Sequence, residues 1–134
     1  MKEFFIIFRP GSAFPHIAET EVKDGNLCPF LWEKIECDCF TTVNFDDCIM
    51  IVDDDGLLKG REVNPVPTLL YNQKGIANSF QPIVGPAVIG LRGERDGEPD
   101  IVGFDSLLSA FQFATKILQR CDKDMQLKEG DSNE

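Results

Sequence analysis

Several patterns on which catalytic sites are commonly built are missing from this chain of 134 residues. The chain has one histidine, His16, and five cysteines without a C-x-x-C pair. Ser, His and Asp do not occur in an order typical of a catalytic triad, and no glycine-rich loop is present that would hold a phosphate. We therefore expect a protein that is not an enzyme and that uses no cofactor.

Metal-binding spacing is absent too, although two segments are rich in ligand types. Cys37-Asp38-Cys39 is spaced too tightly for a zinc pair, whose members usually have about two to four residues between them. The string Asp53-Asp54-Asp55-Gly56 resembles a calcium loop, but a register that places Gly56 sixth would begin at Ile51, whose side chain cannot bind the ion. We expect no metal site.

The chain also lacks long apolar runs and a recognisable signal sequence. No segment approaches the roughly 18 apolar residues of a membrane span, and no basic stretch followed by an apolar run begins the chain. Together with an odd number of cysteines, this favours reduced thiols and a cytoplasmic protein that does not bind a membrane.

Positive charge is scarce and is not clustered. The chain has 13 basic and 23 acidic residues and a formal net charge of −10, with acids concentrated at 46–55 and 122–134. Direct binding of duplex nucleic acid needs clustered Lys and Arg, so we expect none. The acidic surface either faces a basic partner or serves solubility alone.

The residues that are present predict one α+β domain over 4–121, followed by an acidic disordered tail over 122–134. The predicted sheet is mixed or antiparallel with about five strands, and a C-terminal amphipathic helix and a shorter second helix pack on it. The expected strands are 4–8, 17–22, 39–45, 48–53 and a last one within 80–91, and the expected helices are 27–37, capped by Asn26, and one from Asp105 or Ser106 to Cys121.

Glycine and proline define the expected turns. Gly56 should supply a positive φ after the fourth strand, and Pro86 argues for an edge position or a bulge in the last strand. We expect residues 68–71 to form a short helical turn or a loop, and 92–99 to form a mobile charged loop. The strand Phe4–Phe8 and the strand that contains Pro86 cannot both be central without cover, and a homodimer would be one way to provide it.

Six polar residues are the candidates for binding a ligand or partner. Arg61, Asn64 and Thr68 would anchor a ligand beside an apolar wall formed by Phe80 and Tyr71. The carboxylates of Asp53 and Asp55 lie on the acidic turn. The alternative is structural: Asn64 before Pro65 makes an Asx-type turn, and Arg61 with Lys59 forms a solvated pair.

Three strings resemble a known family. V-D-D-D-G-L-L-K-G-R-E-V-N-P-V-P-T ends at Thr68, I-V-G-P-A-V-I-G ends at Gly90, and F-D-S-L begins at Phe104. Together they resemble the domain of unknown function 3846, which comprises small single-domain proteins of phages, plasmids and other mobile elements. Pro67 stands where that family tends to have alanine, so the loop after Asn64 is expected to differ.

The resemblance implies a genomic setting rather than a chemistry. We expect an accessory protein of a phage or mobile element that binds and inhibits a host or defence protein through its acidic surface, the partner presenting a basic surface. The alternative is a protein that binds or sequesters a small, nucleotide-like molecule.

Overall fold

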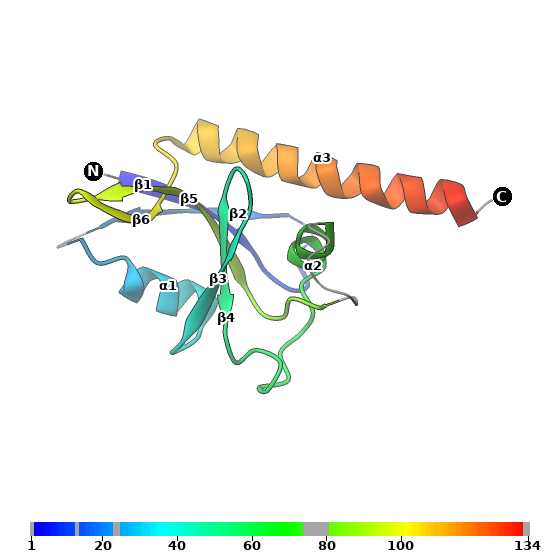
Figure 1. The fold of residues 1–134 in the computed structure, drawn as a ribbon, viewed down its shortest axis with the longest axis horizontal. Helices are drawn as coiled ribbons and strands as arrows, with labels where there is room; N and C mark the ends of the chain where they lie inside the picture. The colour runs from blue at the N-terminus through cyan, green and yellow to red at the C-terminus, as the bar shows by residue number, and fades with distance from the viewer. Residues whose placement is uncertain (1, 13, 23–24, 74–80, 133–134) are drawn as a thin grey trace.

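The protein folds into a six-stranded antiparallel sheet with helices on both faces (Figure 1). The structure is a computed structural model that describes residues 2–12, 14–22, 25–73 and 81–132, with 123–132 described through their backbone. The elements in chain order are β1 (Lys2–Phe8), β2 (His16–Glu21), α1 (Cys28–Ile35), β3 (Phe40–Asn44), β4 (Ile49–Asp53), α2 (Pro65–Gln73), β5 (Ala87–Arg95), β6 (Glu98–Val102) and α3 (Leu107–Ser132). The expected α+β class is confirmed.

The apolar run Phe4–Phe8 lies inside the sheet, as its pattern predicts. The strand order is β2-β1-β5-β4-β3, so β1 has a neighbour on each side. Ile6 pairs with Ile17 on β2 and with Ile89 on β5. Continuous apolar sequence is typical of a strand that is covered on both faces, because successive side chains point to opposite sides.

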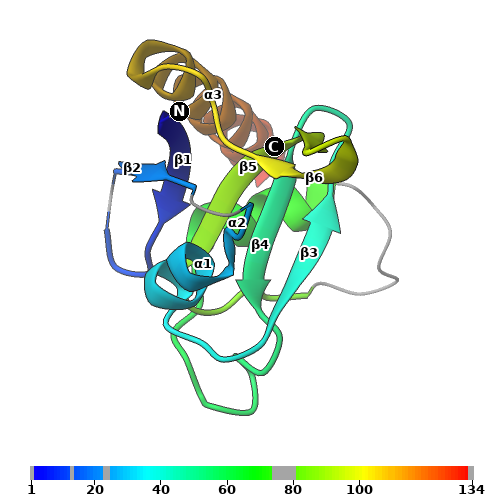
Figure 2. The same cartoon turned by 90° about the vertical axis from the view of Figure 1, so that its left-hand side faces the viewer.

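The two faces of the sheet pack against different helices (Figure 2). On one face, Phe5 and Ile7 join Leu31 and Ile35 of α1 in one buried cluster. On the other face, a second cluster joins strand residues to α2 and α3; its members include Ile6, Phe8, Met50, Ile89, Leu70, Ala110, Ala114 and Ile117. A fully buried Phe or Ile contributes about 1.5–3 kcal/mol. Because helices cover both faces, the two central strands need no dimer for cover.

The segment 92–99, expected to be a mobile loop, is instead a β-hairpin. Arg92 to Arg95 continue β5, and β6 pairs with them from Glu98 onward. Asp96 and Gly97 make the turn with φ of 53° and 81°, a conformation in which Asp-Gly is among the favoured pairs. The expected mobile loop is wrong, because the Asp-Gly turn allows the charged residues on either side of it to pair as strands.

The last central strand begins after Pro86 and not before it. β5 starts at Ala87 and lies between β1 and β4, so the expected edge position or bulge at Pro86 is wrong. Pro86 lies just outside the ladder, where its missing N–H costs nothing. Gly85 turns the chain into the strand with φ of 75°.

The turn after β4 does not use Gly56 as expected. The residue with positive φ there is Gly60, at 69°. Gly56 is required for space, because a Cβ at this position would lie 2.6 Å from Cγ2 of Val84. The close approach of residue 84 to the turn could not be seen in the local sequence.

Two helix starts differ from the expected ones. α2 contains Pro65 and Pro67 in its first turn, where backbone N–H groups have no partner within the helix. At α1, Leu27 occupies the N-cap position without a side-chain cap, although Asn26 accepts a hydrogen bond from the N–H of Cys28 at 3.1 Å.

α3 begins as expected and ends later. The N–H of Ser109 donates to Oγ of Ser106 at 3.0 Å, so Ser106 caps the helix. The helix continues to Ser132, past the end of its apolar stripe at Cys121, whereas we expected a disordered tail over 122–134. Extending an existing helix costs far less than nucleating one, which allows polar residues to follow the packed part.

Candidate functional site

A loop closed by a buried ion pair follows β4. The carboxylate of Asp53 is fully buried and accepts hydrogen bonds from Arg61 at 2.8 Å, from Lys59 at 3.0 Å and from the N–H of Asp55 at 2.9 Å. Burial raises the pKa of Asp53, but the hydrogen bonds from Arg61, Asp55 and Lys59 lower it by more. The pKa of Asp53 therefore lies below its ordinary value of 3.8. Asp53 therefore stays ionised and holds both ends of the loop.

Arg61 also ties this loop to α1. Its Nη1 donates to the carbonyl oxygen of Ile35 at 2.9 Å and to that of Glu36 at 3.3 Å. Its Nη2 donates to the Glu36 carboxylate at 3.3 Å. The last carbonyls of a helix have no partner within the helix, and a cation there is favoured. Arg61 is thus a structural clamp, and a solvated pair of Arg61 with Lys59 is not what the structure shows.

Backbone hydrogen bonds stiffen the same loop, which we call the acidic loop (residues 54–62). Lys59 donates to Asp55, Gly60 to Leu57 and Arg61 to Gly56, at 3.1–3.2 Å. Leu57 and Leu58 are left 64% and 90% exposed at its tip. An adjacent apolar pair held outward on a braced loop is costly to leave in water and is typical of a contact surface.

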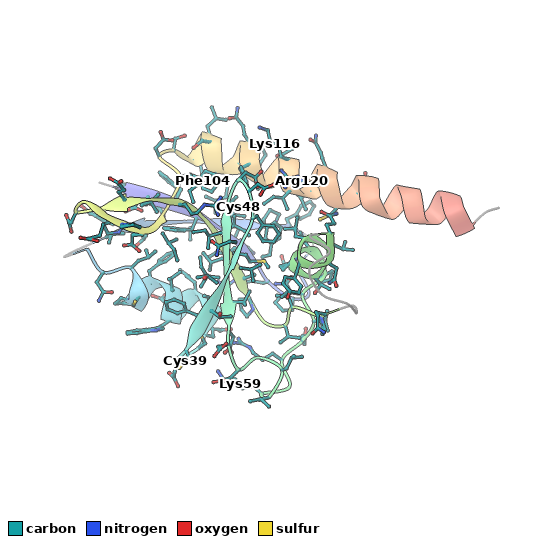
Figure 3. The ribbon with its side chains drawn as sticks, in the orientation of Figure 1. Cys39, Cys48, Lys59, Phe104, Lys116 and Arg120 are labelled. Atoms are coloured by element: carbon teal, nitrogen blue, oxygen red, sulfur yellow. The ribbon has the colours of Figure 1, made fainter. Side chains whose placement is uncertain are left out.

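Carboxylates precede and follow the exposed leucines in the acidic loop. Asp54, Asp55 and Glu62 are exposed and make no ion pair with any described residue. Asp38 is close by, because the N–H of Asp54 donates to the carbonyl oxygen of Cys39 at 3.1 Å. Cys39 and Lys59 lie together at the end of the molecule away from α3 (Figure 3).

Cations elsewhere do little to offset this charge. Among the described residues, six of the basic side chains are in ion pairs within the chain: Lys2, Lys34, Lys59, Arg61, Arg95 and Arg120. Arg92 donates instead to the carbonyl oxygens of Asp46 and Cys48. Unpaired carboxylates therefore largely determine the electrostatic potential at the surface of the described part of the chain.

The predicted site residues separate into two groups. Asp53, Asp55 and Arg61 come together in the loop region. Asn64 and Thr68 lie elsewhere and brace the chain: Nδ2 of Asn64 donates to the carbonyl oxygens of Phe8 at 2.8 Å and Gly85 at 3.0 Å. Oγ1 of Thr68 donates to the carbonyl of Ile83 at 3.2 Å and accepts from its N–H at 2.9 Å.

The remaining members of the predicted ligand site are Tyr71 and Phe80. Tyr71 is half-buried in α2 and packs against the cluster on the α3 face. Phe80, expected to form the apolar wall, lies outside the described residues. The bonds of Asn64 to Phe8 and Gly85 are long-range ties rather than a local Asx turn.

A hollow of about 410 Å³ opens beside the clamp. Its lining residues are Arg9, Pro10, Glu36, Gly60, Arg61, Glu62, Gly85 and Pro86. Arg9 makes no ion pair with any described residue, so its guanidinium is available at the rim. Sequence patterns did not indicate Arg9 or Glu36, because only the fold brings them beside Arg61. They did not indicate the exposure of Leu57 and Leu58 either.

Two of the thiols, those of Cys37 and Cys48, offer little nucleophilic character. Burial raises the pKa of Cys48 to about 12 and also raises that of Cys37. Within the part of the chain that the structure describes, no three His, Cys, Asp or Glu side chains are grouped so as to hold a metal ion. The described helices include none that is both long and apolar enough to cross a membrane.

Comparisons of the chain with known protein families, with curated proteins and with solved structures give no match. The resemblance to the domain of unknown function 3846 therefore stays an expectation, and the function has to be argued from the geometry of the acidic loop.

Proposed function

We propose that this protein is a non-enzymatic accessory protein of a phage or mobile element that binds and inhibits a host or defence protein in the cytoplasm. The contact surface would be the acidic loop with Asp38 beside it. The observation that carries the proposal is the outward pair Leu57 and Leu58 on a loop whose base is fixed by Asp53 and Arg61.

The chemistry of this surface defines the partner. A basic patch would be attracted by Asp54, Asp55 and Glu62, and an apolar depression within that patch would accept the leucine pair. Hot spots of protein interfaces are commonly apolar anchors within a polar rim. Because the loop is braced before binding, little conformational entropy is lost when it docks. Occupying a basic surface that normally holds nucleic acid would inhibit the partner.

A non-catalytic role agrees with the state of the buried groups. The Asp53 carboxylate is occupied by three donors, and the thiol of Cys48 is held protonated by burial. Neither group is set up as a general base or a nucleophile, which would need a pKa near the working pH.

The test is affinity capture from a lysate of the natural host at about 50 mM and about 500 mM salt, where exposed charges are screened to very different degrees. Asp54→Asn with Asp55→Asn removes two charges from the loop, and Glu94→Gln with Glu98→Gln removes two from the β5–β6 hairpin as a control. We expect a host protein that is retained by the parent chain and the control but lost by the loop variant and at high salt. Equal retention by both variants would contradict the proposal.

The apolar half of the surface has its own matched pair. Leu57→Ser with Leu58→Ser should abolish capture, whereas Leu107→Ser with Leu108→Ser, another exposed leucine pair, should leave it intact. Capture that survives the first change but not the second would place the contact on α3.

A second function is supported by the hollow beside Arg9 and Arg61: binding or sequestering of a small nucleotide-like molecule. An unpaired guanidinium is well suited to a phosphate group. Native mass spectrometry of the protein as purified should then show a bound mass of roughly a few hundred daltons, the size such pockets hold. Arg9→Gln should lose it and Lys116→Gln should keep it. A bare protein would argue against this second function.

A further inference from the structure

The exposed side of α3 carries a second apolar surface, separate from the acidic loop. Phe111 is 61% exposed, and Leu107 and Leu108 are exposed beside it. Ala110, Ala114 and Ile117 of the same helix are buried against the sheet. The apolar stripe of α3 is therefore wider than the sheet covers, and one side of it faces solvent.

A groove of about 280 Å³ runs along this surface. Phe14, Pro15 and Ile17 form one wall, and Phe111, Ala114 and Leu118 form the other. Phe14 is 75% exposed, so both walls end in an aromatic ring that is largely in water. A protruding ring next to an apolar groove suits a self-complementary interface, because each copy supplies both parts.

Charge decides which partner this surface fits. Residues 106–121 contain no acidic residue, although the whole chain has 23. Two cations lie on this stretch, Lys116 and Arg120 (Figure 3). Arg120 is paired with Asp47 at 2.8 Å, and Lys116 makes no ion pair with any described residue.

Two molecules that each carry −10 repel one another through most of their surfaces. The α3 surface is the exception, since its apolar centre is free of carboxylates and two copies therefore repel one another least when they meet through it. The charge pattern thus favours a second copy of this chain on this surface.

We propose that the protein forms a two-fold dimer through α3, in which Phe111 of each copy enters the groove between Phe14 and Leu118 of the other. The acidic loop lies at the opposite end of the molecule from α3 (Figure 1). Dimerisation would leave both loops exposed, so each dimer would present two identical contact surfaces.

Sedimentation velocity over a range of protein concentrations tests the dimer. The parent chain should sediment as a dimer, and Phe111→Ser should weaken dimerisation at least about tenfold, as truncation of a central aromatic does. Phe14→Ser, on the other wall of the groove, should weaken it similarly. Leu57→Ser with Leu58→Ser removes an equally exposed apolar pair at the other end and should leave the dissociation constant unchanged. The circular dichroism spectrum of each variant confirms that it is folded.

Salt provides an independent readout. Screening reduces the repulsion between two acidic copies, so raising the salt from about 50 to about 500 mM should strengthen the dimer. Docking of the acidic loop on a basic partner should respond in the opposite direction. A parent chain that stays monomeric at about 0.5 mM, well above the dissociation constant of an ordinary specific contact, would overturn the proposal and leave the groove to a different protein. A dimer that Phe111→Ser does not weaken would overturn it as well.

Discussion

Arg61 and Asp53 are joined at 2.8 Å across the base of the acidic loop, eight residues apart in the chain, and the side chain of Asp53 is fully buried. The same guanidinium reaches the last carbonyls of α1. One side chain therefore fixes the loop against both the sheet and a helix. The exposed leucines of this loop are presented by a rigid base, which is the basis of the proposed contact surface.

Removing the charge of Asp53 should destabilise the fold. Asp53→Asn leaves Arg61 with no buried counter-charge, and breaking a buried pair by removing one partner costs about 3–5 kcal/mol. We expect a loss near the lower limit, because Arg61 keeps its bonds to α1. Urea unfolding gives the free energy. Asp55→Asn, an exposed neighbour, should cost less than about 0.5 kcal/mol; equal losses would show that the Asp53–Arg61 pair does not fix the loop.

Asn64 should act as a stability residue and not as a ligand anchor. Asn64→Ala removes two buried hydrogen bonds and leaves the carbonyl oxygens of Phe8 and Gly85 without this donor. We expect a loss of about 2–3 kcal/mol in urea unfolding. Asn26→Ala, which removes an exposed hydrogen bond before α1, should cost about 1 kcal/mol or less. A stable Asn64→Ala protein would contradict the structural role.

The Glu3–Arg95 pair predicts how stability depends on pH. Hydrogen bonds from Arg95 lower the pKa of Glu3 below its ordinary 4.5, and burial opposes this only in part. The unfolded chain then binds the proton more tightly, so this stabilisation is complete above about pH 5 and is lost as the pH falls through the folded-state pKa. Glu3→Gln should cost about 2 kcal/mol near pH 7.

As the pH falls below the ordinary pKa of 4.5, the cost of Glu3→Gln should shrink, because unfolding of the parent chain then takes up a proton at Glu3. Urea unfolding at several pH values checks this. Glu98→Gln removes an exposed carboxylate of the same charge and should cost less than about 0.5 kcal/mol near pH 7. An effect of Glu3→Gln that is as large at pH 3 as at pH 7 would rule out the ion pair as its origin.

Thiol labelling should separate the cysteines by burial. Cys39 is exposed, whereas Cys48 is buried with a pKa raised to about 12. Because the thiolate is the reactive form, iodoacetamide at about pH 8 should modify Cys39 at least about 100-fold faster than Cys48. Peptide mass spectrometry after short pulses gives the rates. In urea the two rates should converge, and comparable rates in the folded protein would be inconsistent with this packing.

Much of the fold could be predicted because its signals are local. The run Phe4–Phe8 indicated a central strand, and the β-branched residues of 39–45 and 48–53 indicated a hairpin; both are confirmed. The sequence also predicted that the C-terminal helix starts at Asp105 or Ser106, and Ser106 caps it. The missed hairpin at Asp96 and Gly97 had a local signal too, which the surrounding charges obscured.

The site was harder to predict because its contacts are long-range. Asp53, Asp55 and Arg61 were candidates, but the partners of Arg61 in α1 are 25 and 26 residues away. Asn64 is a polar residue in a predicted loop, and only the fold shows that its side-chain amide donates to the carbonyl oxygen of Phe8, 56 residues away. The acids next to Leu57 and Leu58 are visible in the sequence, but the exposure of these two leucines is not.

The pairing of β1 with β5 also bears on how the protein is made. Ile6 cannot meet Ile89 until the 83 residues that follow Ile6 have been synthesised. At about 5–20 residues per second, the apolar strand near the N-terminus waits several seconds with one edge unpaired. Such an edge can bind to another nascent chain. A chaperone at the ribosome exit would protect this strand, and slow translation before residue 89 would be expected to lower the yield of folded protein.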